Sequence, residues 1–234
     1  MPVNIIYILK HYRFNFFEKK NIRINNYMAQ TSNISDINVF DVVNNYAKLR
    51  GYYQQYNRQA LNWYKNEISK LGNINRLKLL GDNIEYQQSK PQVGSFCLFF
   101  YSAKGYREKT LPYFDAFPLT IMLDSFSTNG NNYVSGLNVH YLPPMQRLQL
   151  LTKIIEIQGS NFGQAQKLNV TYELIKSATN LYKPTYHTYL IKEIRSRVVV
   201  IPPESVTPAV FLPIASWKGA SQTKVWSNSK KIIL

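Results

Sequence analysis

The spacing of apolar residues changes between residues 82 and 93 of this 234-residue chain, and the change limits the folds that the chain can adopt. Up to about residue 82, apolar residues recur every three or four positions, which is typical of amphipathic helices. From residue 93 onward they form short runs bounded by Gly, Pro and Asn, which are typical of buried strands. The order of the two patterns predicts an α+β fold, with an N-terminal helical hairpin followed by a small, mostly antiparallel sheet or partial barrel with inserted helices.

The helical pattern covers residues 36–82. Ser35 and Asp36 are typical N-cap residues, and Gly72 is a typical residue to end a helix. Two sets of apolar residues with helical spacing lie between them: Val39, Val42, Val43, Tyr46, Leu49 and Tyr53, then Leu61, Tyr64, Ile68 and Leu71. These two segments predict the helical hairpin.

Residues 93–216 are expected to form the α+β body. The predicted strands are VGSFCLFFYSA (93–103), FPLTIMLDSF (117–126), YVSGLNVHY (133–141), RSRVVVIPP (195–203) and the short AVFLPI (209–214). The turn cluster STNGNN joins the second strand to the third, so residues 117–141 are expected to form a β-hairpin. Residues 217–234 follow the body as a basic C-terminal tail.

Helices are expected between the third and fourth of these strands. Pro143 and Pro144 suit the first turn of a helix, and apolar residues with helical spacing follow them. A second helix is expected from about Leu168, and a third from Pro184 through Ile194.

The chain carries 28 Lys and Arg residues against 13 Asp and Glu, a formal charge of +15. Such a charge attracts a polyanion through counterion release. Between residues 48 and 78, basic residues alternate with tyrosines and Trp63, which suits either a surface that follows a nucleic-acid backbone or the solvated face of a helical hairpin. The candidate DNA-binding residues are Lys48, Arg50, Arg58, Lys65, Arg76, Lys78, Arg195, Arg197, Lys218, Lys224, Lys230 and Lys231.

The first 35 residues are rich in Asn, Ile, Tyr, Phe and Lys, which AT-rich DNA encodes by composition alone, and Met28 offers a second start. This segment is expected to be a disordered or non-native extension, with a basic arm along nucleic acid as the alternative. Lys10, His11 and Arg13 interrupt its apolar run, so a signal peptide is not expected. No window reaches the roughly 18 apolar residues of a membrane span, which predicts synthesis in the cytosol without membrane contact.

No sequence motif for catalysis or metal binding is present. The single cysteine, Cys97, excludes internal disulfides and multi-cysteine zinc sites. The chain has no Walker-type phosphate loop, no paired-glycine dinucleotide turn and no His-Glu zinc helix. The histidines, at positions 11, 140 and 187, have no carboxylate at metal-ligand spacing. We therefore expect no catalytic residue, no metal and no cofactor.

His140 lies in SGLNVHYLPP, and we expect a structural role for it. If the third strand continues through this stretch, Leu137, Val139 and Tyr141 face one side, and Asn138 and His140 face the other.

Asp115 in LPYFDAFP is an isolated carboxylate among aromatic residues, and we expect a structural role for it as well. It is either a turn residue that accepts backbone N–H groups or the partner of Arg195 or Arg197 in an ion pair. A composite site of His140 with Asp115 or Asp124 is the catalytic alternative.

Several stretches of the chain together resemble one family. They are LFFYSAKGYREKTLPYFDAFPLTIMLD, GLNVHYLPPMQRLQLL, YKPTYHTYLIKEIRSRVVVIPPE, AVFLP and KGASQTKVWSNSKKI, and the resemblance covers roughly Trp63 to Ile232. Together they resemble virion proteins of T-even-like tailed phages (myoviruses), in the DNA end protector or head-completion family. The family's FYDPK-like segment appears here as residues 100–104 without its Asp and Pro, so a role tied to that turn is not carried over.

The resemblance implies a non-enzymatic virion protein that is assembled in the host cytoplasm, joins the head near the portal and shields the genome ends from exonuclease. Its implied partners are double-stranded DNA ends and other virion proteins of the portal, neck or baseplate. The alternative is a neck or baseplate component that makes only protein–protein contacts through its aromatic residues. An enzyme, such as a nuclease or a peptidoglycan hydrolase, is a third hypothesis.

Overall fold

The computed structural model describes residues 38–52, 57–158 and 171–234, and the structural statements below concern these residues. The expected N-terminal extension, the cap residues Ser35 and Asp36, and the expected helix start near Leu168 lie outside them. Residues 38–234 form one unit by their backbone contacts.

Helices occupy much of residues 39–81, as expected, and an asparagine caps each of them. They are α2 (Val39–Leu49), α3 (Arg58–Lys70) and α4 (Arg76–Gly81). The backbone N–H groups in the first turn of a helix have no hydrogen-bond partner within that helix. Here the side-chain oxygens of Asn38, Asn57 and Asn75 accept hydrogen bonds from such groups. Gly72 follows α3 with a φ of 67°, which confirms the expected end of that helix.

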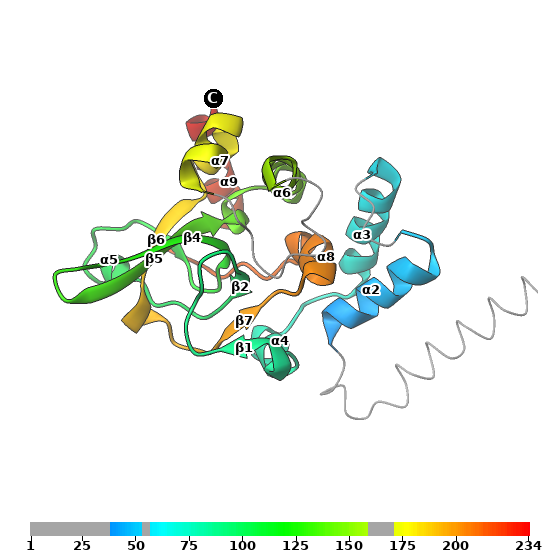
Figure 1. Ribbon diagram of the computed structural model, residues 1–234, viewed down its shortest axis with the longest axis horizontal. Helices are drawn as coiled ribbons and strands as arrows, with labels where there is room; N and C mark the ends of the chain where they lie inside the picture. The colour runs from blue at the N-terminus through cyan, green and yellow to red at the C-terminus, as the bar shows by residue number, and fades with distance from the viewer. Residues whose placement is uncertain (1–37, 53–56, 159–170) are drawn as a thin grey trace, which may run out of the picture. The chain divides into compact units, whose positions relative to one another are not determined.

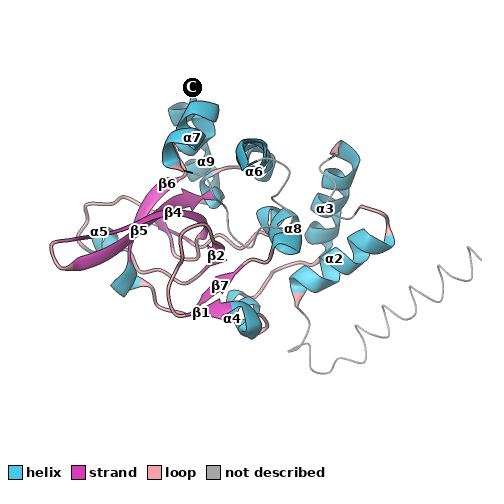
Figure 2. Cartoon of the chain, in the orientation of Figure 1, coloured by secondary structure: helices cyan, strands magenta, loops and turns pink. Residues whose placement is uncertain are grey.

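In the described part of the chain, strands form one six-stranded sheet in the order β1-β7-β2-β4-β5-β6 (Figure 2). Their bounds are β1 (Gln87–Gln88), β2 (Phe96–Leu98), β4 (Leu119–Thr128), β5 (Asn131–Asn138), β6 (Tyr186–Leu190) and β7 (Val198–Val200). Every neighbouring pair is antiparallel. A separate ribbon pairs β3 (Phe114–Asp115) with β8 (Trp217–Lys218). The prediction of an antiparallel sheet is therefore confirmed.

The hairpin of β4 and β5 is the longest strand pairing in the sheet. Asn129 and Gly130 form its turn, both with positive φ, which matches the right-handed twist of the flanking strands. The inner half of β4 is buried, and its outer half, from Asp124 to Thr128, is exposed. The tip therefore extends beyond the core, as the green hairpin in Figure 1 shows.

The sheet is buried on both faces. Alternate residues such as Leu98, Ile121 and Val199 belong to the larger apolar cluster, which also contains the buried residues of the helices. Their neighbours Cys97, Phe99, Met122, Val134, Tyr189 and Val198 form a smaller cluster on the other face. This alternation follows from the two-residue repeat of a strand.

Helices cover the face with the larger cluster. α6 (Pro144–Gln158) and α7 (Tyr172–Ala178) come between β5 and β6 in the chain, and α8 (Val206–Phe211) contacts α2, α3 and α6. Figure 1 shows α8 between α6 and the pair α2 and α3. Pro144 is the first residue of α6, and the carbonyl of Pro143 accepts backbone hydrogen bonds from its first turn, as expected.

The third predicted strand ends earlier than expected. Residues 139–141 form the 3-10 turn η3 (Val139–Tyr141), because the side chain of Asn138 accepts a hydrogen bond from the backbone N–H of His140 and begins the turn. The two-residue alternation of a strand therefore ends at Asn138, and Tyr141 lines the same pocket as Asn138, so their expected division between two faces is wrong.

Two short segments adopt the opposite structure to the predicted one. The helix expected from Pro184 is instead β6 followed by the 3-10 turn η6 (Ile191–Glu193), because the aromatic and β-branched residues of β6 pair with the edge of β5. The strand expected at 209–214 is instead part of α8, which follows the 3-10 turn η7 (Pro203–Ser205) and is buried at every residue. Short apolar runs do not separate a buried strand from a buried helix.

Two further segments differ from their predictions. The strand expected over 93–103 is limited to β2, because the backbone N–H of Phe100 bonds to the side chain of Ser196 and leaves the ladder. The basic C-terminal tail, for which no secondary structure was predicted, contains β8 and helix α9 (Gln222–Ile233). The short helix α5 (Lys104–Arg107) was not anticipated either.

Candidate nucleic-acid interface

The candidate DNA-binding residues lie on several separate elements. They are found at the end of α2 (Lys48, Arg50), on α3 (Arg58, Lys65), on α4 (Arg76, Lys78), before β7 (Arg195, Arg197), on β8 (Lys218) and on α9 (Lys224, Lys230, Lys231). In Figure 1, α2 and α3 lie apart from α9, with α6 and α8 between them. These residues therefore form separate groups and not one continuous patch.

Helix α9 carries a group of lysines without acidic neighbours in the sequence. No Asp or Glu occurs from Ser205 to Leu234. Val225 and Ser229 face the interior, and Lys224, Lys230 and Lys231 are exposed. Lys230 and Lys231 lie in the last turn, where the helix dipole favours cations. This helix thus presents positive charge to solvent, and none of its lysines forms an ion pair with a described residue.

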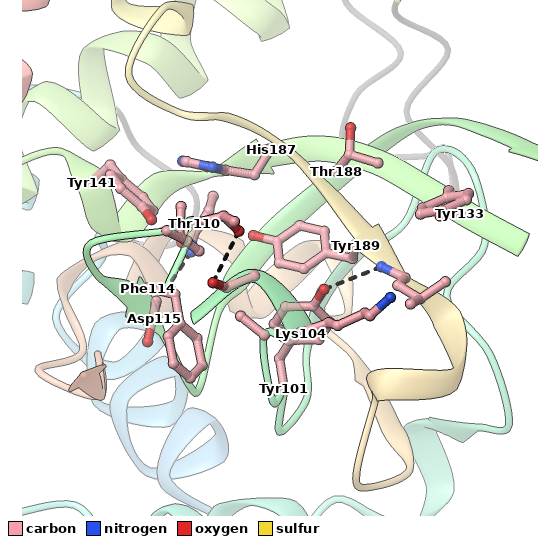
Figure 3. A pocket seen from close by; sticks show the side chains of 15 residues that line it. Tyr101, Lys104, Thr110, Phe114, Asp115, Tyr133, Tyr141, His187, Thr188 and Tyr189 are labelled. Carbon is pink, nitrogen blue, oxygen red and sulfur yellow. Dashed lines mark hydrogen bonds between the residues drawn. The ribbon is translucent and has the colours of Figure 1, made fainter. Parts of the chain in front are cut away.

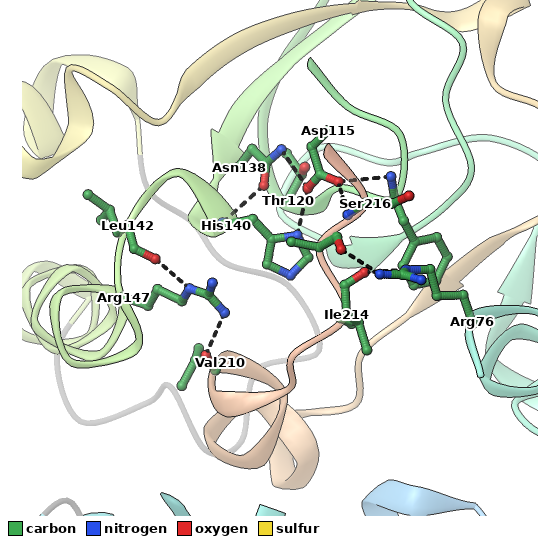
Figure 4. A network of polar contacts seen from close by, with 12 residues as sticks. Arg76, Asp115, Thr120, Asn138, His140, Leu142, Arg147, Val210, Ile214 and Ser216 are labelled. Carbon is green, nitrogen blue, oxygen red and sulfur yellow. Dashed lines mark hydrogen bonds and ion pairs between the residues drawn. The ribbon is translucent and has the colours of Figure 1, made fainter. Parts of the chain in front are cut away.

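Asp115 lies at the centre of a buried polar network (Figure 4). Its Oδ1 accepts hydrogen bonds from the backbone N–H of Phe117 (3.0 Å) and of Ser216 (2.8 Å). Its Oδ2 accepts from Asn138 Nδ2 (3.3 Å) and from His140 Nδ1 (2.6 Å). Neither the Asp115 nor the His140 side chain has any exposed surface. The pair therefore joins β3, η3 and the segment before β8.

The ion pair expected between Asp115 and an arginine after β6 is wrong. Arg195 binds Glu193 instead, at 2.5 Å, and Arg107 binds the other oxygen of the same carboxylate at 2.8 Å. The hydrogen bond from Arg107 lowers the pKa of Glu193. Arg197 has no ion pair with a described residue. Asp115 needs no such partner, because four donors already surround its oxygens.

The hydrogen bonds fix the protonation of this network. Burial lowers the pKa of His140, although the carboxylate of Asp115 opposes this effect, so the ring is neutral at neutral pH. Burial alone would raise the pKa of Asp115, but His140 and two backbone N–H groups lower it overall. His140 therefore carries its proton on Nδ1. Its buried Nε2 has no hydrogen-bond partner among the described residues.

Two arginines complete the network, and both bind backbone carbonyl oxygens. The fully buried Arg147 donates to Leu142 (2.7 Å) and to Val210 (3.0 Å). Burial lowers its pKa to about 10, so it remains a cation at neutral pH. Arg76, a candidate DNA-binding residue, donates to the carbonyls of residues 214–215 at 2.6 and 2.5 Å. Its guanidinium thus holds the segment before β8 in place.

A tyrosine-lined pocket of about 360 Å³ lies beside this network (Figure 3). Its lining comes from α5 and the following loop, from β3, and from β5, η3 and β6. The residues used below are Tyr101, Lys104, Phe114, Tyr133, Tyr141, His187 and Tyr189. Sequence reasoning missed this pocket. The only signal for it was the abundance of tyrosine, because the lining residues come from three separate stretches of chain.

Four side chains that line the pocket, those of Tyr101, Tyr141, Tyr189 and His187, are uncharged at neutral pH. Burial raises the pKa of Tyr101, Tyr141 and Tyr189, so their hydroxyl groups stay protonated. Burial lowers the pKa of His187 to about 4, and its Nε2 lies 3.1 Å from the carbonyl of Pro184, which accepts its hydrogen bond. The ring of His187 also lies against that of Tyr141, with centroids 4.0 Å apart.

The described residues contain no group of three or more His, Cys, Asp or Glu side chains placed to hold a metal ion. Among the same residues, no helix combines the length and the apolar character needed to cross a membrane.

Comparison with known proteins gives one family. A family model described as phage T4 terminal DNA protecting protein matches residues 8–233. This match is wider than the stretches that carry the resemblance in the sequence, and it includes every element described above. No curated protein and no solved structure matches the chain.

Proposed function

Because the chain belongs to the family of the phage T4 terminal DNA protecting protein, which matches residues 8–233, we propose that it binds the ends of double-stranded phage DNA and shields them from exonucleases. The family match is the observation that carries this proposal. The exposed lysines of α9 support it.

The proposed place of action is the phage head, near the portal, after the genome has been packaged in the host cytoplasm. A terminus of packaged DNA is accessible there, so a protein bound to it meets other virion proteins of the portal or neck. This position rests on the resemblance in sequence and on the family description.

The charge of the chain supports contact with DNA. A formal charge of +15 produces a favourable long-range attraction to phosphate, and α9 offers lysines without nearby acids in sequence. Contacts to phosphate do not depend on base sequence, which suits a protein that binds any genome end.

We also propose that the protein acts without turnover. The catalytic alternative rested on His140 with Asp115 or Asp124. The structure pairs His140 with Asp115, but both side chains are fully buried and their bonding atoms are directed at each other and at backbone groups. Asp124 is exposed and accepts from the N–H of Ser125. The buried pair supports a role in holding the fold.

The second candidate function is a neck or baseplate component that makes only protein–protein contacts. Exposed apolar side chains favour it: Leu77 is 71% and Ile84 is 73% exposed. Such residues are typical of surfaces that a protein partner covers.

An exonuclease protection assay tests the proposal. A linear duplex labelled at its ends is incubated with the full chain and then with a processive double-strand exonuclease. The proposed function predicts that the label persists in proportion to the protein bound, and that a nicked circle, which has no duplex end, is not protected against an endonuclease. Equal digestion with and without saturating protein would overturn the proposal in favour of the protein-contact alternative.

A further inference from the structure

The tyrosine-lined pocket has the size of a site for a single base. Its volume of about 360 Å³ lies near the lower end of the roughly 300–1,000 Å³ typical of small-molecule sites. Tyr101, Tyr133, Tyr141, Tyr189 and Phe114 supply aromatic rings to it from several directions (Figure 3). Aromatic rings bind nucleobases by stacking, whatever the sequence, because every base has a π-face.

The charges around the pocket suit a nucleotide, because a lysine lies at the rim and a carboxylate lies below the floor. Lys104 lines the pocket, and its ammonium group lies 3.3 Å from the carboxylate of Glu108 in an exposed ion pair. An exposed pair of this kind is weak, so a phosphate can compete with Glu108 for the ammonium group. The side chains of Tyr101, Tyr141, Tyr189 and His187 are neutral. The ionised carboxylate of Asp115 lies beneath the floor, without exposed surface. A phosphate is therefore repelled from the floor and attracted to the rim, while an uncharged base is accepted inside.

The pocket also adjoins the lysine-bearing helix. On α9, Trp226 donates to the carbonyl of His140 at 3.0 Å, and Asn228 donates to the hydroxyl of Tyr113 at 3.3 Å. These contacts hold α9 against η3 and against Tyr113, which precedes β3; η3 contributes Tyr141 to the pocket, and β3 contributes Phe114. A duplex whose end lies at the pocket thus has a basic helix beside it.

We propose that this pocket holds the terminal base of a DNA end, with the terminal phosphate at Lys104. The inference rests on the proposed function and adds the means by which the protein distinguishes an end from the middle of a duplex. A terminal base stacks on one neighbour only, so its removal from the stack costs less than that of an internal base. Positive charge alone attracts the end and the middle of a duplex equally. A pocket that accepts one base favours the end.

The experiment compares the full chain on two blunt duplexes that differ only at their termini. One has ordinary terminal nucleotides, and the other has an abasic residue at the terminus of each strand; closed circular DNA is the competitor. The unmodified protein is expected to bind the ordinary end about tenfold more tightly than the abasic end, which is the typical contribution of one stacked base.

Two substitutions separate the pocket from the fold. Tyr133→Leu removes a ring of the pocket and should abolish the tenfold preference without weakening binding to the abasic end. Phe126→Leu is the matched control, because Phe126 and Tyr133 form one stacked pair (centroids 5.4 Å apart, planes at 15°) and Phe126 does not line the pocket. Both variants lose the same stack, so both should melt at similar temperatures, but Phe126→Leu should keep the preference.

Lys104→Gln tests the phosphate contact at the rim. It should weaken binding to both duplexes and reduce the salt dependence of binding. Lys109→Gln is its control, since Lys109 is an exposed lysine of the same loop that does not line the pocket. Equal effects of the two lysine variants on both duplexes would contradict a specific role for Lys104.

The possible failures are distinguishable. If the unmodified protein prefers ends to circles but binds ordinary and abasic ends equally, the pocket proposal is overturned and the proposed function stands. If the protein shows no preference for ends over circles, the proposed function is overturned, and the pocket proposal that rests on it is overturned as well. If Tyr133→Leu and Phe126→Leu reduce the preference equally, the effect comes from their shared stack, and the pocket proposal is again overturned.

Discussion

Individual buried residues hold the junction between β3, η3 and the segment before β8. The carboxylate of Asp115 accepts hydrogen bonds from two backbone N–H groups, from Asn138 and from His140, all shielded from water. A buried carboxylate of this kind stabilises the fold only while its donors remain in place, since a buried polar group without partners is costly.

Asp115→Asn is expected to lower the free energy of unfolding by about 2–4 kcal/mol at neutral pH. The pKa of Asp115 is lower in the folded protein than in the unfolded chain, so its contribution is complete above about pH 4 and is lost as the pH falls through the folded value. The difference in unfolding free energy between the unmodified protein and Asp115→Asn should therefore be constant from pH 7 to about pH 4 and should become smaller below pH 4. Urea unfolding at several pH values measures it.

Asp124→Asn is the matched control for this change. Asp124 is exposed, and its carboxylate accepts from a neighbouring backbone N–H only, so the variant should differ by less than about 0.5 kcal/mol. A gap between Asp115→Asn and the unmodified protein that persists unchanged far below pH 4 would show that the charge of Asp115 is not responsible.

Arg76→Ala is expected to act on the fold and not on DNA. The variant loses the two hydrogen bonds that tie α4 to residues 214–215, so we expect a loss of about 2–3 kcal/mol in unfolding free energy. DNA affinity per folded molecule should change little. Lys78→Ala, in the same helix, should leave stability within about 0.5 kcal/mol. A drop in DNA affinity at unchanged stability for Arg76→Ala would place this residue in the interface instead.

At the scale of single elements, the hairpin of β4 and β5 depends on one close backbone approach. The strand β4 has a register shift between Met122 and Asp124, and Gly136 of β5 lies opposite it. A Cβ atom at Gly136 would lie 2.3 Å from the carbonyl oxygen of Ile121, well inside van der Waals contact. The bulge and the glycine thus occur together, as is common where a strand bends.

Gly136→Ala is expected to destabilise the protein by more than about 3 kcal/mol, since the backbone of β4 must move to admit the methyl group. Gly81→Ala is the control: no atom lies within 4 Å of its added Cβ, and alanine is favoured at the end of α4, so this variant should be neutral or slightly stabilised. Thermal melts of both variants measure the difference. Similar melting temperatures would contradict the close approach.

The elements also show how far sequence reasoning reaches. The turn at Asn129 and Gly130 and the helix start at Pro144 were predictable because local backbone preferences decide them. Residues 184–194 and 206–211 were not, because each is a short apolar stretch whose structure is set by tertiary pairing or burial. The pairing of His140 with Asp115 was only one of several possibilities in the sequence, and the pocket was invisible, because contacts between distant segments create both.

At the scale of the whole molecule, the general attraction of DNA to the net charge differs from contacts between DNA and particular lysines. The net charge acts on any polyanion, whereas α9 supplies particular lysines. Some lysines elsewhere pair with acids: Lys70 pairs with Glu67, and Lys153 with Glu156. Substituting equal numbers of α9 lysines and of acid-paired lysines changes the net charge equally, so the effects of the two sets on DNA binding can be compared directly.

A triple variant of α9, with Lys224, Lys230 and Lys231 changed to Gln, is expected to reduce the slope of log affinity against log salt by about 2.7 if each lysine contacts a phosphate. The control triple changes Lys70, Lys153 and Lys176, which pair with acids at 2.6, 2.7 and 3.9 Å. It should alter the slope much less. Equal slopes for the two triples would show that DNA responds to net charge alone.

The central claim is that this protein recognises DNA ends, and competition binding tests it most directly. The full chain is bound to a labelled linear duplex near physiological salt, and unlabelled linear duplex, closed circular DNA and heparin are added as competitors. The account predicts that linear duplex competes far better per nucleotide than the circle or heparin, and increasingly so as the duplex is shortened, because the number of ends per nucleotide rises. Equal competition by linear duplex, closed circular DNA and heparin would contradict the claim that the protein recognises DNA ends.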